Sequence, residues 1–301
     1  ADTSHIFTVT RGIRDLAGNS LVGNQTDGST YFTVFVGTGM SYGDAPAPYP
    51  TLKAENGARH VIREGFFLGS SVSVSADGLP TVGADAIEGH DGVFFRPDQP
   101  LIPNRPYSLR ITTPGGDCGD ESICVTVSGV GTAVNSPAYL DVWIDWNGNG
   151  SWNDFGDQMV ISQILTPQML ASGITLNRTV PPGALPGDTY ARFRLSTAGS
   201  LAPTGETDAG EVEDYQVAIV ANPWQNPVNR FDVSGNGIVS PLDVLLVVNW
   251  INDPRNDLTQ RLPAVKPADQ PFVDVNGSGF VEQNGVDALA VINYLNAQAR
   301  S

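Results

Sequence analysis

The stretch DVSGNGIVSPLD, Asp232 to Asp243, runs directly into the apolar segment VLLVVNWI. Numbered from Asp232, positions 1, 3, 5 and 12 carry side-chain oxygens, position 6 is glycine, and position 7 offers a backbone carbonyl. A calcium loop requires oxygen ligands at these positions and a sharp turn at position 6. The sequence therefore predicts a first calcium loop followed by a helix, with the ligands Asp232, Ser234, Asn236, Ile238 and Asp243.

The pattern returns near the C-terminus. VDVNGSGFVEQNGVDALAVINYLN (273–296) matches FDVSGNGIVSPLDVLLVVNWIN (231–252), but it has two extra residues before its terminal acid. Internal duplication implies two copies of one small unit packed together. The predicted ligands of this second loop are Asp274, Asn276, Ser278, Phe280 and Asp287. Either the loop bulges to bring Asp287 in or Glu282 takes its place, so the first loop is expected to bind calcium more tightly.

Prolines stand before both loops, at 223 and 227 and again at 267 and 271, where they block an entering helix. The unit is thus loop–helix, twice, although D-x-N-G strings also occur as ordinary turns. Over about residues 226–297 the pattern resembles the type I dockerin. That resemblance implies calcium binding and a cohesin as the partner on another protein. It also implies a partner surface beside the loops, with the candidates Ser240, Pro241, Gln283 and Asn284.

The rest of the chain is predicted to be mainly β. Short strand-like runs separated by Gly and Pro turns predict an antiparallel β-sandwich over residues 40–220, including SVSVS, GVFFRP, YSLRITT, CVTVSGV, YLDVWIDW, RFRLST and YQVAIV. Residues 1–39 show two further strands, and TRGIRDLAGNSLVGN resembles the closing part of bacterial Ig-like modules. We expect 221–230 to be a Pro/Asn linker and 231–301 to form the small α-helical calcium module.

The central part resembles the GEVED domain of bacterial surface proteins. The resemblance covers about 41–220 and is carried by SYGDAPAPYPTLKAENGARHVI, FFLGSSVSVSADGLPTVGAD, DVWIDWNGNGSWND and GEVEDYQVAI. It implies a β-rich, secreted and non-catalytic module. The strings around Asp77 and Asp91 carry fewer carboxylates than is usual in that family.

Two acidic stretches of this central part suggest another cation site. IDWNGNGSWNDFGD repeats the spacing of a calcium loop, and GETDAGEVEDYQV crowds acids without a base. Such crowding is costly unless water or a cation offsets it. One prediction is a calcium ion shared by Asp145, Asn147, Asn149, Glu213 and Asp214. The alternatives are a β-hairpin tip and a solvated acidic loop.

The composition of the chain limits the classes of partner that it can bind. The 301-residue chain has a net charge of -16 and a pI near 4.3, which disfavours nucleic acid and anionic membranes and suits cations. No apolar run approaches the roughly 20 residues of a membrane span. The N-terminus lacks signal-peptide features, so we expect a mature chain or a fragment. Cys118 and Cys124 could form a disulfide or remain reduced thiols.

No G-x-S-x-G, H-E-x-x-H or phosphate-loop motif occurs, which argues against catalysis. The leading hypothesis is a non-catalytic, calcium-binding protein, extracellular or on the cell surface, that attaches to a cohesin-like or other extracellular protein. One alternative is a polysaccharide-binding sandwich with a dockerin, in which Trp143, Trp146 and Trp152 stack on sugars instead of forming core. Another is the C-terminal accessory region of a larger secreted hydrolase.

Overall fold

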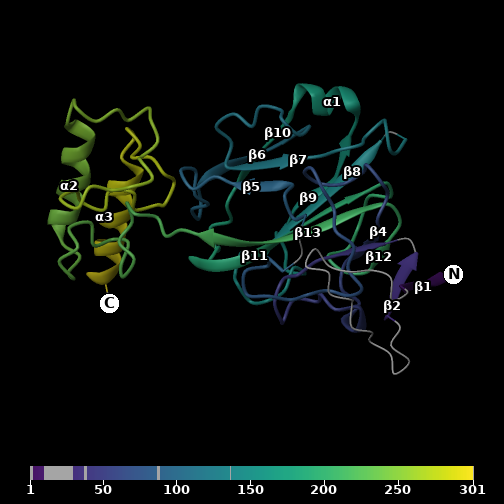
Figure 1. Ribbon diagram of the computed structural model, residues 1–301. Coiled ribbons are helices and arrows are strands. Elements are labelled where there is room, and N and C mark those ends of the chain that lie inside the picture. Colours follow the sequence, from purple (N-terminus) through teal and green to yellow (C-terminus); the bar gives the residue numbers. More distant parts are fainter. Residues whose placement is uncertain (1–2, 10–29, 37–38, 87–88, 136, 301) are drawn as a thin grey trace, which may run out of the picture.

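A computed structural model describes residues 3–9, 30–36, 39–86, 89–135 and 137–300 (Figure 1). Strands β1 (Thr3–Val9) and β2 (Thr30–Val36) form an antiparallel pair with Thr3 opposite Val36, which confirms the two strands expected there. The segment TRGIRDLAGNSLVGN, which suggested an Ig-like module, lies outside the described residues.

Two four-stranded sheets form the central sandwich. The first has the order β10–β6–β7–β5 and the second β13–β11–β8–β9. Alternate side chains of both sheets, such as Leu109 and Ile111 from one and Val142 and Phe193 from the other, meet in a single buried core. The strands are β5 (Val93–Phe95), β6 (Pro106–Thr112), β7 (Ile123–Thr126), β8 (Ala138–Ile144), β9 (Gln158–Leu165), β10 (Ile174–Thr179), β11 (Gly187–Ser196) and β13 (Gly210–Ile219). The mainly β class is as predicted.

Three details differ from the sequence prediction. Strands β6 and β7 run parallel, whereas the other strand pairs of the two four-stranded sheets are antiparallel. The SVSVS run contributes only a bridge between Ser75 and Met40, because alternating residues alone do not supply a partner strand. A short helix, α1 (Pro167–Ser172), starts at Thr166, whose hydroxyl accepts a hydrogen bond from the Met169 amide.

A third, small sheet covers the outer face of the second sheet. It consists of β3 (Met40–Tyr42), β4 (Arg59–Val61) and β12 (Glu206–Thr207), and a 3₁₀ turn at Lys53–Glu55 lies between β3 and β4. The hydroxyl of Ser41 donates to the Val212 carbonyl and accepts from the Val212 amide, which ties this sheet to β13. The outer face is therefore buried rather than solvated, including its charged side chains.

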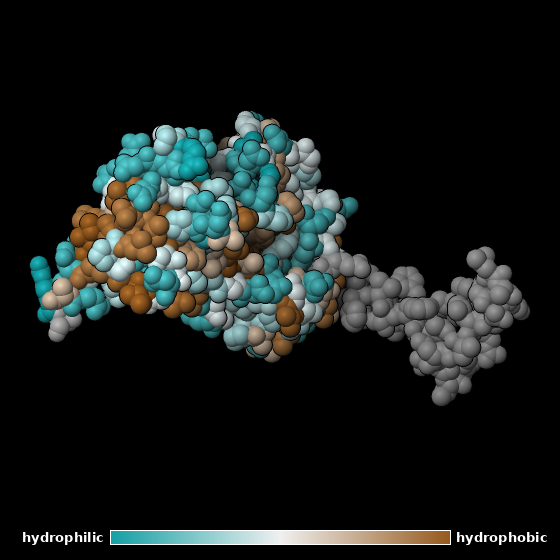
Figure 2. All heavy atoms as spheres, turned by 90° about the vertical axis from the view of Figure 1, so that its left-hand side faces the viewer, coloured by the Kyte–Doolittle hydropathy of each residue, from teal (hydrophilic) through white to brown (hydrophobic). Residues whose placement is uncertain are grey.

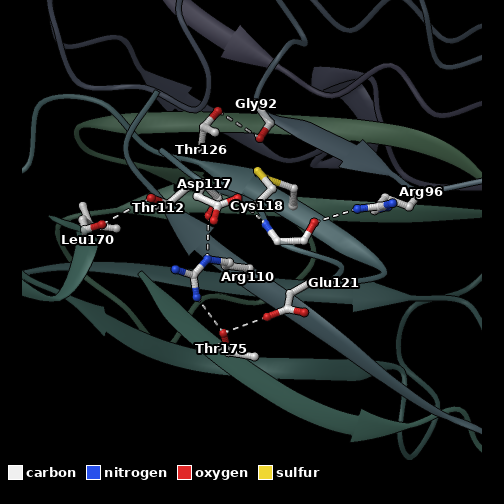
Figure 3. The surroundings of a disulfide bond; sticks show 12 residues. Gly92, Arg96, Arg110, Thr112, Asp117, Cys118, Glu121, Thr126, Leu170 and Thr175 are labelled. Atoms are coloured by element: carbon white, nitrogen blue, oxygen red, sulfur yellow. Dashed lines mark hydrogen bonds between the residues drawn. A yellow bond between two sulfur atoms is a disulfide. The ribbon is translucent and has the colours of Figure 1, made fainter. Parts of the chain in front are cut away.

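Cys118, in the connection between β6 and β7, forms a disulfide with Cys124 of β7 (Figure 3). The loop that it closes is also held by arginines, since Arg96 donates to the Gly119 carbonyl and Arg110 to the Asp117 carbonyl. The question left open by the sequence, disulfide or free thiols, is answered in favour of the disulfide.

The C-terminal module has its own core around α2 (Pro241–Asn252) and α3 (Val286–Gln298), and it lies at one end of the sandwich (Figure 1). Trp224 belongs to this core, and its carbonyl accepts from the Asp274 amide at 3.0 Å. The segment expected to be a linker thus packs as part of the module. Leu242 and Leu245 of α2 are about half exposed.

Candidate metal centres and docking face

The first loop is closed by its two acids, which are both buried. Asp232 accepts hydrogen bonds from the backbone amides of Gly235 and Gly237, at 2.9 and 2.7 Å. Asp243 accepts from the amides of Ser234 and Ser240, both at 2.8 Å. Ser240 is also the N-cap of α2, so the acid at position 12 joins the loop to the helix.

The second loop repeats this arrangement despite its two extra residues. Asp274 accepts from the Gly279 amide at 2.8 Å, as Asp232 accepts from Gly237. The Asn276 amide donates to Asp287 at 3.0 Å, as the Ser234 amide donates to Asp243. The bulge therefore brings Asp287 back to the loop.

Glu282 lies in the second loop as well. It accepts hydrogen bonds from the Ser278 hydroxyl at 2.8 Å and from the Asn276 side-chain amide at 3.3 Å. The sequence offered Asp287 and Glu282 as alternatives, whereas the structure places both acids in the loop. The second loop thus contains one more carboxylate than the first.

The two loops differ in how their carboxylate oxygens are paired. In the part of the chain that the structure describes, Asp274 Oδ1 and Asp287 Oδ2 are buried without a hydrogen-bond donor, whereas no oxygen of Asp232 or Asp243 is in that state. Burial, together with the adjacent Glu282, raises the pKa of Asp287 to about 8. Adjacent carboxylates such as those of Asp287 and Glu282 repel each other unless they share a proton or bind a cation, so the second loop fits a calcium ion.

The remaining predicted ligands lie in the turns of the loops. The side-chain oxygens of Asn236 and Asn276 accept from the amides two residues ahead, both at 2.8 Å. The Ser234 hydroxyl donates to Asp232, and the Ser278 hydroxyl accepts from the Phe280 amide at 3.2 Å. Among the described residues, no group of three or more His, Cys, Asp or Glu could hold a metal by itself. Calcium would therefore need Ser, Asn and backbone oxygens, including the carbonyls of Ile238 and Phe280.

The two acidic stretches of the sandwich have different hydrogen-bond partners. Asp145 is buried and accepts from the Tyr49 hydroxyl at 2.6 Å and from the Gly150 amide at 2.8 Å. Asn147 and Asn149 donate their side-chain amides to Asp154. This is a hydrogen-bonded turn at the end of β8, as in the alternative interpretation of the sequence.

The premise that the acids at 206–214 lack a cationic partner is wrong. Arg192, on the adjacent strand β11, makes an ion pair with Asp214 at 2.7 Å, and both side chains are fully buried. Burial alone would raise the pKa of Asp214, but Arg192 outweighs it and holds that pKa below its ordinary value. The cationic partner comes from a neighbouring strand, which is why the local sequence did not show it.

The other acids of this motif bind backbone amides of distant loops. Glu213 accepts from the amides of Asp91 and Gly92 at 2.9 and 3.1 Å, and Glu211 accepts from the Leu68 amide at 2.7 Å. Burial raises the pKa of Glu213 to about 7. Because Asp214 also accepts from the Ala45 amide, the motif holds loops between residues 45 and 92 against β13, a structural role that no local pattern indicated.

The tryptophans and His60 also have structural positions. Trp143, Trp146 and Trp152 are at most 4% exposed, so stacking on a sugar is not open to them in this structure. His60 is fully buried and accepts a hydrogen bond from Arg194 at 2.9 Å. These positions favour packing over sugar binding for the tryptophans, and a hydrogen-bonding role for His60.

Helices α2 and α3 together present an exposed apolar face on the module. Figure 2 views the molecule from the module's side and shows hydrophobic side chains gathered on its surface. A shallow groove runs between the two helices beside this face, lined by Pro241, Val244, Leu245, Val248, Ile292, Leu295 and Asn296. The exposed apolar side chains, here called the helix face, are Leu242, Leu245, Val286, Leu289 and Ile292.

The four predicted partner-binding residues stand next to the helix face. Ser240 is half-buried because it caps α2, whereas Pro241, Gln283 and Asn284 are exposed at or just before the helix starts. The structure makes three of them accessible to a partner.

Comparison with protein families identifies two modules. Residues 139–218 match the GEVED domain, and residues 230–296 match the dockerin type I domain. Both are non-catalytic modules. No curated protein and no solved structure gives a match. None of the helices in the described ranges has the length and apolar character needed to cross a membrane.

Proposed function

Because the chain carries a GEVED domain and a type I dockerin domain, we propose that it is a non-catalytic, calcium-binding protein of the extracellular space or cell surface. Its C-terminal module attaches it to a cohesin-like protein. The observation that carries this proposal is the combination, in one module, of two loops with buried acids, of which the second holds unpaired carboxylate oxygens, and an exposed apolar helix face.

Calcium would be held by the loop residues named above, with Asp232 and Asp243 in one loop and Asp274 and Asp287 in the other. It would supply the positive charge that buried carboxylates otherwise lack. Asp243 and Asp287 lie in the first turns of α2 and α3, so ordering the loops also orders the starts of both helices. Calcium binding and presentation of the helix face are thereby linked.

The helix face supplies the contact with the partner. Exposed contiguous apolar side chains mark interaction sites, and here they come from both repeats of the module. Polar groups at the edge, from Gln283 and Asn284, would add orientation. The acidic chain as a whole favours a partner surface that is neutral or basic at the rim.

A binding assay against a panel of purified cohesin domains tests this function. The full chain should bind at least one cohesin in calcium and lose that binding in chelator. Leu245→Glu and Leu289→Glu should each weaken binding at least tenfold, because a charge on the helix face must be desolvated. Leu185→Glu, at a similarly exposed leucine of the sandwich, is the matched control and should bind normally.

Calcium-independent binding, or equal affinity of the Leu245→Glu and Leu185→Glu variants, would contradict the proposal. The two alternatives make separate predictions. If the chain binds polysaccharide, it should bind glycans on an array, and the Leu245→Glu and Leu289→Glu variants should bind them equally well. If the chain is an accessory region of a larger hydrolase, the dockerin module would still bind a cohesin. A separate domain of that hydrolase would then carry the catalytic activity.

A further inference from the structure

We propose that the sandwich completes the outer part of the second calcium loop, with Arg105 as a positioning residue for Asp274. The inference rests on the proposed calcium binding and goes beyond it, because neither module alone would contain the arrangement. It makes the sandwich and the dockerin module one cooperative unit at this loop.

Arg105 stands just before β6 and points out of the sandwich into the module. It is 4% exposed and donates to the Leu262 carbonyl at 3.1 Å and to the Asn222 side-chain oxygen at 3.0 Å. Its guanidinium also lies 3.5 Å from Asp274, the first acid of the second loop. A buried arginine with these contacts joins two modules that are far apart in sequence.

Asn222 passes this contact on to the loop. Its side-chain oxygen accepts from Arg105 and from the Trp224 amide at 3.1 Å, which turns its NH₂ group toward Asp274. That NH₂ group donates to Asp274 Oδ2 at 2.8 Å. Oδ2 is thus held from outside the loop, and the unpaired oxygen, Oδ1, is the one left for a cation.

In the part of the chain that the structure describes, the second loop has such a cover and the first does not. A Cβ added at Gly279, position 6 of the second loop, would lie 3.1 Å from Arg105 Nε. Within the described residues, a Cβ at the equivalent Gly237 would meet nothing within 4 Å. Asn104 adds a further contact from the sandwich, since its NH₂ group donates to the Asn276 carbonyl at 3.3 Å.

Through these contacts, packing of the sandwich against the dockerin module is coupled to calcium binding at the second loop. Groups that orient a metal ligand from outside typically change metal affinity 10–100-fold. The positive charge of Arg105 opposes a cation, but its shorter hydrogen bonds go to neutral groups, on Leu262 and Asn222, and the carboxylate is farther away. The orientation of Asp274 by Arg105 therefore outweighs the repulsion between Arg105 and the cation. By linkage, calcium at the second loop strengthens the contact between the sandwich and the dockerin module.

The test uses the full chain with Asp232→Ala, in which the second loop keeps its first acid and the first loop does not. Arg105→Gln should lower calcium affinity in this background about tenfold by calorimetry. Arg105→Lys keeps the charge but has one nitrogen in place of the two that contact Leu262 and Asn222, so it should also weaken binding. Arg255→Gln, at an exposed arginine of the dockerin module, should have no effect.

Hydrogen exchange in chelator separates this inference from the proposed function. Even without calcium, Arg105→Gln should speed exchange of the Gly279 and Asn276 amides, and Arg255→Gln should not. Unchanged exchange and unchanged calcium affinity would overturn the positioning role, as would a rise in affinity. Absence of calcium binding in the unmodified chain, with exchange still dependent on Arg105, would refute calcium binding and the coupling but leave the module contact standing.

Discussion

Arg192 and Asp214 lie opposite each other on β11 and β13 and form two hydrogen bonds of 2.7 Å, with both side chains fully buried. The second oxygen of Asp214 also accepts from the Ala45 amide at 2.9 Å. Arg192 donates further to the carbonyls of Pro50 and Pro203. The pair therefore joins the second sheet to the segment that covers it.

Asp214→Ala should destabilise the sandwich by about 3–5 kcal/mol, because it leaves the Arg192 guanidinium buried without its counter-charge. The loss should be the same in calcium and in chelator, since the partner of Asp214 is an arginine. Thermal or urea unfolding under both conditions measures it. Asp208→Ala, at an exposed acid of the same stretch, is the control and should stay within about 0.5 kcal/mol. A loss confined to calcium would restore the shared-cation hypothesis.

Glu213→Gln should change the pH dependence of stability. Burial raises the pKa of Glu213 from 4.5 to about 7, so the folded state binds a proton more strongly than the unfolded state. The contribution is present below pH 4.5 and is lost as pH rises to about 7. Gln cannot ionise, so the variant should lose less stability over that window than the unmodified chain. Parallel profiles from pH 4.5 to 8 would show that Glu213 does not titrate in this range.

Asp274→Ala should reduce calcium binding more than Asp232→Ala, the reverse of the expectation from sequence. The second loop contains Asp274, Glu282 and Asp287, and calcium affinity rises with the charge of the ligands. It also holds the two unpaired carboxylate oxygens. Calorimetry on the two full-length variants compares them, and a larger loss for Asp232→Ala would show that the regular spacing of the first loop matters more than charge.

Calcium should slow hydrogen exchange in both loops of the full chain. Without the ion, the loop acids hold their amides by hydrogen bonds alone, and local opening exposes the amides of Gly237 and Gly279. Amides in the sandwich core, such as that of Phe193, serve as the internal reference. Equal protection of both glycines with calcium and with chelator would mean that the loops are fully ordered by the protein.

Local patterns predicted the local features of this protein. The glycine at position 6 and the acids at fixed spacing located both loops, and prolines before them correctly indicated loop–helix units. The strand-like runs YLDVWIDW and YQVAIV coincide with β8 and β13, whose Val142, Ile144 and Val217 face the core, because strand side chains point alternately to opposite faces.

Long-range pairings could not be predicted in this way. Arg192 reaches Asp214 from another strand, and Arg105 reaches Leu262 across 157 positions, so no local window contains both partners. The exposure of Leu242 and Leu245 could not be predicted either, because an apolar stripe on a helix indicates burial whether a domain core or a binding partner covers it.

Native mass spectrometry of the full chain, titrated with calcium after chelation, tests the central claim most directly. The account predicts two bound calcium ions, one remaining ion in Asp232→Ala and in Asp274→Ala, and none in the double variant. Retention of two ions by the double variant, or no calcium bound by the unmodified chain, would contradict it.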